Sequence, residues 1–343
     1  MSLPEARGSD APTRVGVALS NEVPLEESIA LARRAEELGF DEVWVPESRH
    51  GRSATTAAAV LARDTSRIGI GVGVVNPFWR HPSLIAMEAA ALDEASGGRL
   101  RLGIGAALWT LRALGEDDER TRRPLAAMIE AVRVIKAMLA GVDGIDGDIF
   151  RVRADARLDF EPLRRDVPVY VGAVNRRMVE AAGACADGVY LGAITSPGYV
   201  RWARERMADG AREAGRDPHG LDLCANVLTS VSNDAKAARD ACRKVLTYYL
   251  WRVEPVVHES SGADPEAVAF VRSRVQEEGV DAVAERLPDH LIDVFAAAGT
   301  PDMVMAKLAE FEEAGLRGFL AWYVFGPDPD EGLRLLVEAM RAR

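Results

Sequence analysis

The chain contains little of what marks secreted and membrane proteins. It has three cysteines in 343 residues, and no apolar run approaches the roughly 18 residues that span a bilayer. Residues 1–13 lack the apolar core of a signal peptide. The cysteines have the pattern of reduced core thiols, since they are odd in number and far apart in apolar stretches: Cys185, Cys224 and Cys242. The sequence therefore predicts a cytoplasmic protein with no membrane partner.

Motifs for metal binding and for activated nucleophiles are also missing. The five histidines lie at positions 50, 81, 219, 258 and 290. None of them has the spacing of an HExxH motif and no CxxC pair occurs, so we expect no metal site. The absence of G-x-S-x-G and of a P-loop argues against serine hydrolases and P-loop NTPases.

Basic residues are outnumbered. The 42 lysines and arginines face 53 acidic residues, which gives a net charge of -11. Such a chain has no overall attraction to phosphate polymers, so nucleic acid is not an expected partner. An anionic ligand would have to be held by a local site. At 48% hydrophobic residues, the chain can still bury a large core.

What the chain does contain is a regular alternation of short β-branched runs with longer helical patterns, which is typical of parallel βαβ units. Eight runs are predicted to be strands: 14–20, 41–47, 67–75, 99–105, 167–173, 187–193, 221–231 and 317–325. Eight strands, each followed by a helix, favour a closed (β/α)8 TIM barrel over an open doubly wound sheet. We expect a disordered tail at 1–13 and a single domain over 14–343.

Two segments interrupt this rhythm. Turn residues predict a loop or small hairpin at 141–166, after the fourth strand. A helical insertion is predicted at about 235–313, between the seventh and eighth strands. Its aromatic side chains and histidine are expected to shape a substrate entrance, since ligands bind where barrel strands end: Tyr248, Tyr249, Trp251 and His258.

The third strand carries two glycines, Gly71 and Gly73, among β-branched residues. Glycine weakens a strand unless a bulge or a close approach of the backbone requires it. Two interpretations stay open. Either the backbone approaches a ligand here, or the glycines only ease packing of the barrel.

Three segments resemble a known family. They read GVVNPFWRHP (73–82), ALDEASGGRLRLGIG (91–105) and VPVYVGAVNRRMVEAAGACADGVYLGA (167–193). This order resembles the bacterial luciferase-like flavin and deazaflavin oxidoreductases, and within them the coenzyme F420-dependent branch related to methylenetetrahydromethanopterin reductase. The resemblance extends over nearly the whole chain after the tail. It implies hydride transfer between the deazaflavin C5 and a small organic substrate.

The resemblance also implies where the cofactor binds. In this family the third strand ends in a bulge with a non-prolyl cis peptide, here Gly73–Val74, that supports the ring. The ring contacts implied for this chain are Gly73, Val74, Val75 and Asn76. The phosphate contacts implied are Gly172, Ala173, Val174 and Asn175, where helix amides suit an anion and Arg176 and Arg177 could add charge. Gly192 and Ala193 would line the cofactor as well.

The catalytic residues are less well matched to the family. Relatives carry an acidic residue followed by histidine after the second strand, whereas this chain has Glu47 followed by Ser48 and then His50 two positions later. Glu47 and His50 are the predicted proton donor or acceptor. Ala18 replaces a glutamate of the methanopterin reductases, and Ala106–Ala107 replace one of the sugar-phosphate dehydrogenases, so the substrate stays open.

Two alternatives to an F420-dependent enzyme remain. One is an FMN-dependent monooxygenase of the same barrel that uses O₂, and the other is a cofactor-binding barrel without catalytic activity. A homodimer is expected from the resemblance. The Ala-rich faces at 54–62 and 84–95 are candidates for its interface, although they could equally pack on the barrel. Three tryptophans near strand ends could wall a pocket or pack the rim: Trp79, Trp109 and Trp322.

Overall fold

The computed structural model describes residues 13–47, 50–115 and 119–342. Of the predicted tail, only Thr13 lies within this part, and its hydroxyl donates to the Leu316 carbonyl at 3.3 Å. Ser48, which follows Glu47, lies outside the described residues. No helix in the described ranges has the length and apolar character needed to span a bilayer.

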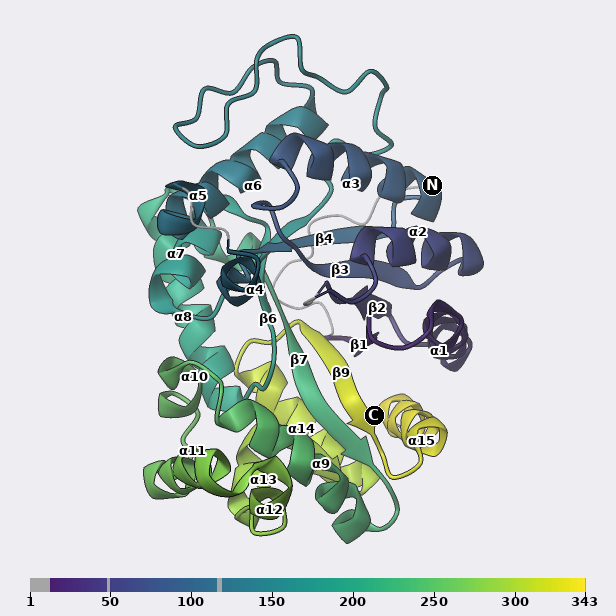
Figure 1. The fold of residues 1–343 in the computed structure, drawn as a ribbon. Coiled ribbons are helices and arrows are strands. Elements are labelled where there is room, and N and C mark those ends of the chain that lie inside the picture. The colour runs from purple at the N-terminus through teal and green to yellow at the C-terminus, as the bar shows by residue number, and fades with distance from the viewer. Residues whose placement is uncertain (1–12, 48–49, 116–118, 343) are drawn as a thin grey trace.

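The strands form a closed parallel barrel (Figure 1). They are β1 (Arg14–Ala18), β2 (Glu42–Val45), β3 (Gly69–Val75), β4 (Leu100–Gly105), β5 (Val169–Gly172), β6 (Gly188–Leu191), β7 (Asp222–Val231), β8 (Ala296–Gly299) and β9 (Gly318–Phe325). Neighbours pair in chain order from β1 to β7, and β9 closes the ring between β7 and β1. The predicted barrel is confirmed, and the open sheet is excluded.

Helices lie around the barrel. They are α1 (Leu25–Leu38), α2 (Ala54–Asp64), α3 (Pro82–Ser96), α4 (Leu108–Ala113), α5 (Glu119–Arg122), α6 (Pro124–Ala140), α7 (Arg176–Cys185), α8 (Pro197–Glu213) and α15 (Pro329–Arg341). Local chemistry sets their ends: glycines at 39, 97 and 141 adopt the left-handed conformation that terminates α1, α3 and α6. The short helices α4 and α5 were not predicted.

The insertion before the last barrel strand contains α9 (Ala235–Leu250), α10 (Pro255–Glu259), α11 (Pro265–Glu278), α12 (Val280–Ala284), α13 (Asp289–Phe295) and α14 (Pro301–Glu313). In Figure 1 these helices gather beside β7 and β9, away from the 141–166 loop. The prediction of helices alone is wrong at β8, whose residues 296–299 pair with residues 228–231 of β7. Three alanines and a glycine have no strand preference of their own, so the pairing with β7 decides their conformation.

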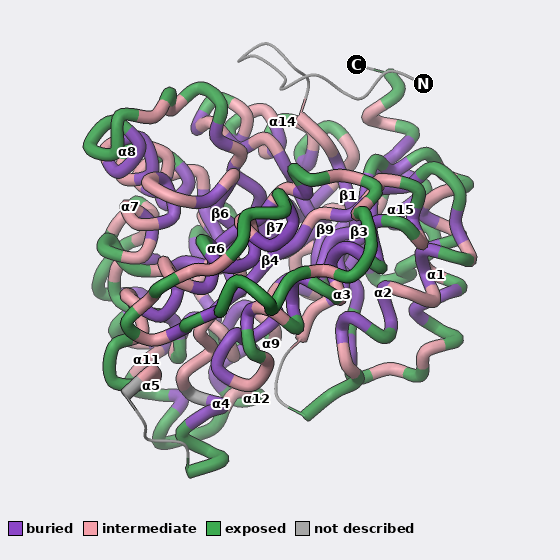
Figure 2. The backbone as a smooth tube through the Cα atoms, turned by 90° about the horizontal axis from the view of Figure 1, so that it is seen from above, coloured by how far each residue is buried: buried purple, intermediate pink, exposed green. Residues whose placement is uncertain are grey.

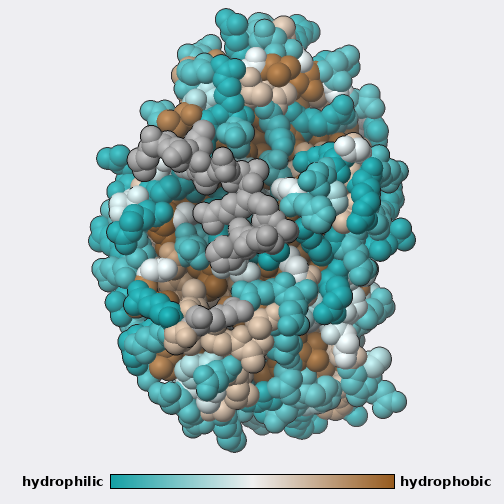
Figure 3. Space-filling view, turned by 180° about the vertical axis from the view of Figure 1, so that it is seen from behind, coloured by the Kyte–Doolittle hydropathy of each residue, from teal (hydrophilic) through white to brown (hydrophobic). Residues whose placement is uncertain are grey.

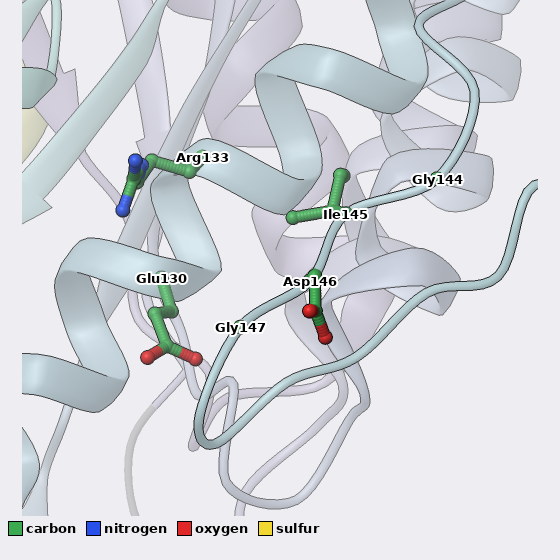
Figure 4. A pocket seen from close by; sticks show the side chains of 6 residues that line it. All are labelled: Glu130, Arg133, Gly144, Ile145, Asp146 and Gly147. Carbon is green, nitrogen blue, oxygen red and sulfur yellow. The ribbon is translucent and has the colours of Figure 1, made fainter.

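The segment 141–166 is a long loop with one antiparallel bridge, between Ile145 and Val152. Glu130 of α6 holds it, because its carboxylate accepts hydrogen bonds from the backbone N–H groups of residues 148–150 at 2.8 to 3.2 Å. Between α6 and this loop lies a cavity of about 260 Å³ (Figure 4), lined by Glu130, Arg133 and residues 144–147. None of the sequence-predicted site residues lines it. The loop or small hairpin predicted here is confirmed.

The strands at the centre of Figure 2 are buried. Trp44, 1% exposed, stacks on Tyr190 with ring centroids 5.0 Å apart. A Cβ at Gly71 would lie 2.1 Å from the Trp44 ring, and one at Gly73 would lie 2.9 Å from it. Packing of Trp44 against the backbone therefore explains why the third strand needs Gly71, and ligand contact is not required there.

Charged groups occupy the amino-terminal end of the barrel. Arg14 contacts Glu42 at 3.2 Å and Asp222 at 2.6 Å, and Arg101 contacts Glu42 at 3.3 Å. Burial by itself would raise the pKa of Asp222, but Arg14, Arg101 and the Tyr170 hydroxyl hold that pKa below its ordinary value. This end of the barrel is thus closed by paired charges, which leaves the opposite end for a ligand.

The three cysteines are free thiols, with Cys224 and Cys242 buried and Cys185 half-buried. Burial raises the pKa of Cys185 to about 11 and that of Cys242 to about 12. These thiols are therefore protonated at neutral pH, as expected of core residues rather than nucleophiles. Within the described ranges, no group of three or more metal-ligating side chains occurs.

Hydrophilic residues dominate the face shown in Figure 3.

Candidate active site

A bulge in β3 shapes the carboxyl end of the barrel. The peptide between Gly73 and Val74 is cis, and the pairing with β4 shifts register between Val72 and Val75. The cis bond and the bulge predicted from the resemblance are therefore present. The Val74 side chain lies on the backbone of the next strands, because a Cβ at Gly105 would be 2.4 Å from its Cγ2 and one at Gly172 2.9 Å from its Cγ1.

Asn76 ties the loops after β3 and β4 together. Its Nδ2 donates to the Ala106 carbonyl at 2.8 Å, and its Oδ1 accepts from the Phe78 N–H at 2.8 Å. The side chain is 3% exposed. The predicted contact with a ring edge stays a prediction, and the observed bonds show that Asn76 also fixes the shape of this part of the site.

The loop after β5 leads into the amino terminus of α7. Asn175 caps this helix, accepting the Met178 N–H at 3.2 Å, while Tyr199 of α8 donates its hydroxyl to the Val174 carbonyl at 2.9 Å. The first amides of a helix have no partner within it and suit an anion. Arg176 is engaged with Glu180 at 2.6 Å. The predicted phosphate contacts thus lie beside a capped helix terminus.

Gly192 and Ala193 follow β6, the neighbour of β5. Ala193 has φ of 61°, an uncommon conformation for a residue with a side chain. A Cβ at Gly192 would meet only Tyr190, at 3.7 Å, so this position is open. The Thr195 hydroxyl, fully buried in the same loop, has no hydrogen-bond partner in the part of the chain that the structure describes. The loop after β6 therefore has an open backbone position at Gly192 and a buried hydroxyl at Thr195 that could bind a ligand.

Glu47 is held in an ionic network after β2. One oxygen pairs with Arg80, which follows β3, and the other accepts the Ala54 N–H at 3.2 Å at the start of α2. Its side chain is 8% exposed. Arg80 also lies 3.6 Å from Glu88 of α3, and burial raises the pKa of Glu88 although Arg80 opposes the shift. Both Glu47 oxygens are thus engaged in contacts that join α2 to the β3 loop.

His50, the other predicted proton carrier, is exposed after β2. Its ring lies parallel to that of Trp79, with centroids 6.0 Å apart. His81 does not join them, since its Nδ1 caps α3 by accepting the Ser83 N–H at 3.2 Å. His81 therefore serves as a helix cap.

The carboxyl ends of β2, β3, β5 and β6 therefore bring the predicted residues to one end of the barrel. Parallel strands place their carboxyl ends together, and this end holds the active site in barrel enzymes. Sequence reasoning missed Arg80, although it lies inside the N-P-x-x-R-H-P motif that carried the resemblance. A buried carboxylate such as that of Glu47 needs a cationic partner, and the arginine of this motif was the signal in the sequence for that partner.

Comparison with known proteins agrees with this arrangement. The chain is 32% identical over 308 residues to 5,10-methylenetetrahydromethanopterin reductase of Methanolobus tindarius, covering 89% of this chain and 92% of the relative. It is 33% identical to the enzyme of the same name from Archaeoglobus fulgidus over 308 residues, covering 88% and 91%. The solved F420-dependent tetrahydromethanopterin reductase of Methanopyrus kandleri superposes with a TM-score of 0.86 at 26% identity, covering 96% of this chain and 98% of that one.

A family model described as luciferase-like monooxygenase matches residues 7–318. That range includes the bulged β3, the β5 loop and the β6 loop. The chain belongs to the luciferase-like monooxygenase family.

Proposed function

We propose that the protein is a cytoplasmic F420-dependent oxidoreductase acting on a small organic substrate. The observation that carries the proposal is the bulge at Gly73–Val74, with Val74 seated over Gly105 and Gly172. The similarity of the chain to the coenzyme F420-dependent tetrahydromethanopterin reductase of Methanopyrus kandleri supports the cofactor. Coenzyme F420, when bound, would supply a hydride donor or acceptor at C5. We also propose that residues 14–343 form a single domain.

The described residues fit such a cofactor. The backbone of Gly73, Val74 and Val75 would support the back of a flat ring, with Asn76 at its edge. Val74 fits here only because positions 105 and 172 are glycine, since a Cβ at either position would clash with it. These close contacts hold the ring support in place. The α7 terminus, at Gly172 to Asn175, would hold the phosphate through backbone N–H groups. Gly192 and Ala193 would border it.

Proton transfer is assigned to Glu47 or His50. Arg80 and the α2 amide orient the Glu47 carboxylate, while His50 is exposed and lies against Trp79. A proton carrier must reach the reacting group directly or through one water. The exposure of His50 favours it as the residue that exchanges a proton with the substrate, and Glu47 as the group that keeps the β2 loop in place.

Binding of F420 to the purified protein tests the proposal directly. We expect F420 to bind the purified protein with a micromolar dissociation constant, measured by fluorescence titration, because the bulged β3 fits its ring and the amino terminus of α7 fits its phosphate. Reduced F420 should then be oxidised by at least one member of a substrate panel, whereas His50→Gln should slow turnover without changing F420 affinity.

The same titration with FMN separates the alternatives. Micromolar FMN binding with no F420 binding would replace the proposal by an FMN-dependent monooxygenase, which the family description keeps in view. F420 binding without turnover of any panel member would favour a non-catalytic barrel.

We also propose a homodimer that buries one face of α3. Leu84 and Met87 on this helix are 41% and 49% exposed, which is unusual for large apolar side chains on neighbouring turns. We expect light scattering to give twice the 37.1 kDa chain mass. Leu84→Glu combined with Met87→Glu should shift it to the monomer, and an unchanged mass would place the interface elsewhere.

A further inference from the structure

Three aromatic side chains contact one another at the carboxyl end of β9. We call Tyr249 of α9 with Trp322 and Tyr323 of β9 the aromatic platform. Tyr249 lies 4.9 Å from Trp322 and 6.4 Å from Tyr323 between ring centroids, and Trp322 lies 5.1 Å from Tyr323. All three contacts are edge-to-face, with interplanar angles of 67° to 75°. The insertion thus supplies one wall of this surface and the barrel supplies the other.

Strand register places the platform at the mouth of the barrel. Ala18, the last residue of β1, pairs with Trp44 on one side and with Trp322 on the other. Laterally paired residues of a parallel sheet face the same side, and Trp44 faces the interior because it packs on Gly71. Trp322 therefore faces the interior in the same layer. Ala18, whose side chain is a single methyl group, lies between the two tryptophans in this layer.

The backbone at this end of β9 holds one ring in the open. Tyr323 has φ of 75° and Phe325 has φ of 64°, both left-handed conformations that are uncommon for bulky residues. Tyr323 is 56% exposed, whereas its neighbour Trp322 is 9% exposed. Packing alone does not account for a tyrosine displayed in this way. Bulky residues in strained, left-handed conformations cluster at active sites and ligand-binding segments, where the conformation contributes to function.

A positive charge lies on Tyr248, the side chain next to Tyr249 of the platform. Tyr248 contacts Tyr249 with ring centroids 5.1 Å apart. The exposed Arg252 guanidinium lies 4.0 Å from the Tyr248 ring centroid and 4.1 Å from that of Trp251. Its Nη1 donates to the Tyr248 carbonyl at 3.2 Å, which fixes the guanidinium over the rings. In a chain of net charge -11, this arginine gives an acidic ligand a local partner.

We propose that the exposed Tyr323 ring of the aromatic platform stacks on the flat face of a planar, ring-containing substrate whose acidic group points toward Arg252, while Tyr249 and Trp322 hold the Tyr323 ring edge-on. This inference rests on the proposed oxidoreductase function and names its substrate class. The platform and the β3 ring support belong to different parts of the wall, since β2 and β1 separate β3 from β9. A planar substrate on the platform would therefore lie across the mouth of the barrel from the ring support.

The experiment measures ligand binding by the whole chain, so it does not depend on turnover. Naphthoate, naphthamide and cyclohexanecarboxylate are titrated into the protein with and without F420, with tryptophan fluorescence and calorimetry as readouts. These three probes separate the planar ring from the charge. We expect naphthoate to bind at least about tenfold more tightly than either of the others, since each lacks one of the two contacts.

Three variants locate the site. Tyr323→Asn removes the ring but tolerates the left-handed backbone, and we expect it to weaken naphthoate binding about tenfold while F420 affinity stays unchanged. Tyr323→Phe keeps the ring and should bind as the parent does. Arg252→Met should reduce naphthoate binding to the level of naphthamide. Phe160→Ala is the matched control, because Phe160 is another exposed aromatic, 43% exposed, in the 141–166 loop.

The outcomes distinguish this proposal from the function on which it rests. Equal binding of naphthoate and cyclohexanecarboxylate, or parental binding by Tyr323→Asn, overturns the platform even if F420 binds. A change of oligomeric mass in Tyr323→Asn without any change in naphthoate binding also overturns it, and assigns the surface to a second copy of the chain. Platform-dependent naphthoate binding without F420 binding supports the platform and rejects the proposed cofactor.

Discussion

Gly105→Ala is expected to weaken F420 binding by about tenfold or more, which corresponds to roughly 1.4 kcal/mol. The new Cβ would lie 2.4 Å from Val74 Cγ2 and 3.1 Å from Val74 Cβ, far inside contact distance. The other methyl group of Val74 has little free space, since a Cβ at Gly103 or Gly172 would lie 3.3 or 2.9 Å from its Cγ1. The added methyl therefore has to displace the bulge, and overpacking of this kind costs about 1 to 3 kcal/mol. Fluorescence titration with F420 measures the loss.

Gly220→Ala serves as the control, because a Cβ at Gly220 would meet no atom within 4 Å. It should bind F420 as the parent does. Thermal unfolding of both variants shows whether the barrel remains folded. Parental F420 affinity in a folded Gly105→Ala protein would mean that the bulge does not support the cofactor.

Arg164→Ala is expected to lower the free energy of unfolding by about 3 to 5 kcal/mol. Asp93 of α3 is 0% exposed, and Arg164 binds both of its oxygens, with Nε 2.9 Å from Oδ2 and Nη2 2.5 Å from Oδ1. The same guanidinium donates to the Leu100 carbonyl at 3.0 Å. Removing it leaves a buried carboxylate without its partner, which is the costly way to break an ion pair. Urea denaturation followed by circular dichroism measures the change.

The adjacent Arg165 provides a matched comparison. It pairs at 2.6 Å with Glu161, and the two side chains are 58% and 74% exposed. Exposed pairs contribute about 0 to 1 kcal/mol, so Arg165→Ala should unfold nearly at the parental urea concentration. If both arginine variants lost equal stability, the 141–166 loop would not be anchored through Asp93.

The sequence predicted most of the barrel because its strands and helices carry local signals. Buried parallel strands show as β-branched runs, and the helices between them end at glycines such as Gly39 and Gly97. Where a segment lacks such signals, prediction was wrong, as at 296–299. These residues are a strand only because the long β7 offers an unpaired edge beyond its pairing with β6.

Some features of the candidate site could likewise be predicted from local sequence, and others could not. Motif spacing located the bulge, the β5 loop and the β6 loop, since each follows a strand that can be recognised from sequence. The partners of Glu47 were not predictable, because Arg80 lies 33 positions away and α2 meets it only in the folded chain. The role of Gly71 was equally undecided until Trp44 of the neighbouring strand was seen against it.

The number and order of the barrel strands, the net acidity and the family could be predicted without the fold, because they depend on composition, periodicity and local spacing. Which side chains meet depends on the folded chain. Ala18 lies between Trp44 and Trp322, and Tyr249 of the insertion reaches β9. Contacts across the barrel depend on strand register and closure, which no local stretch of sequence encodes.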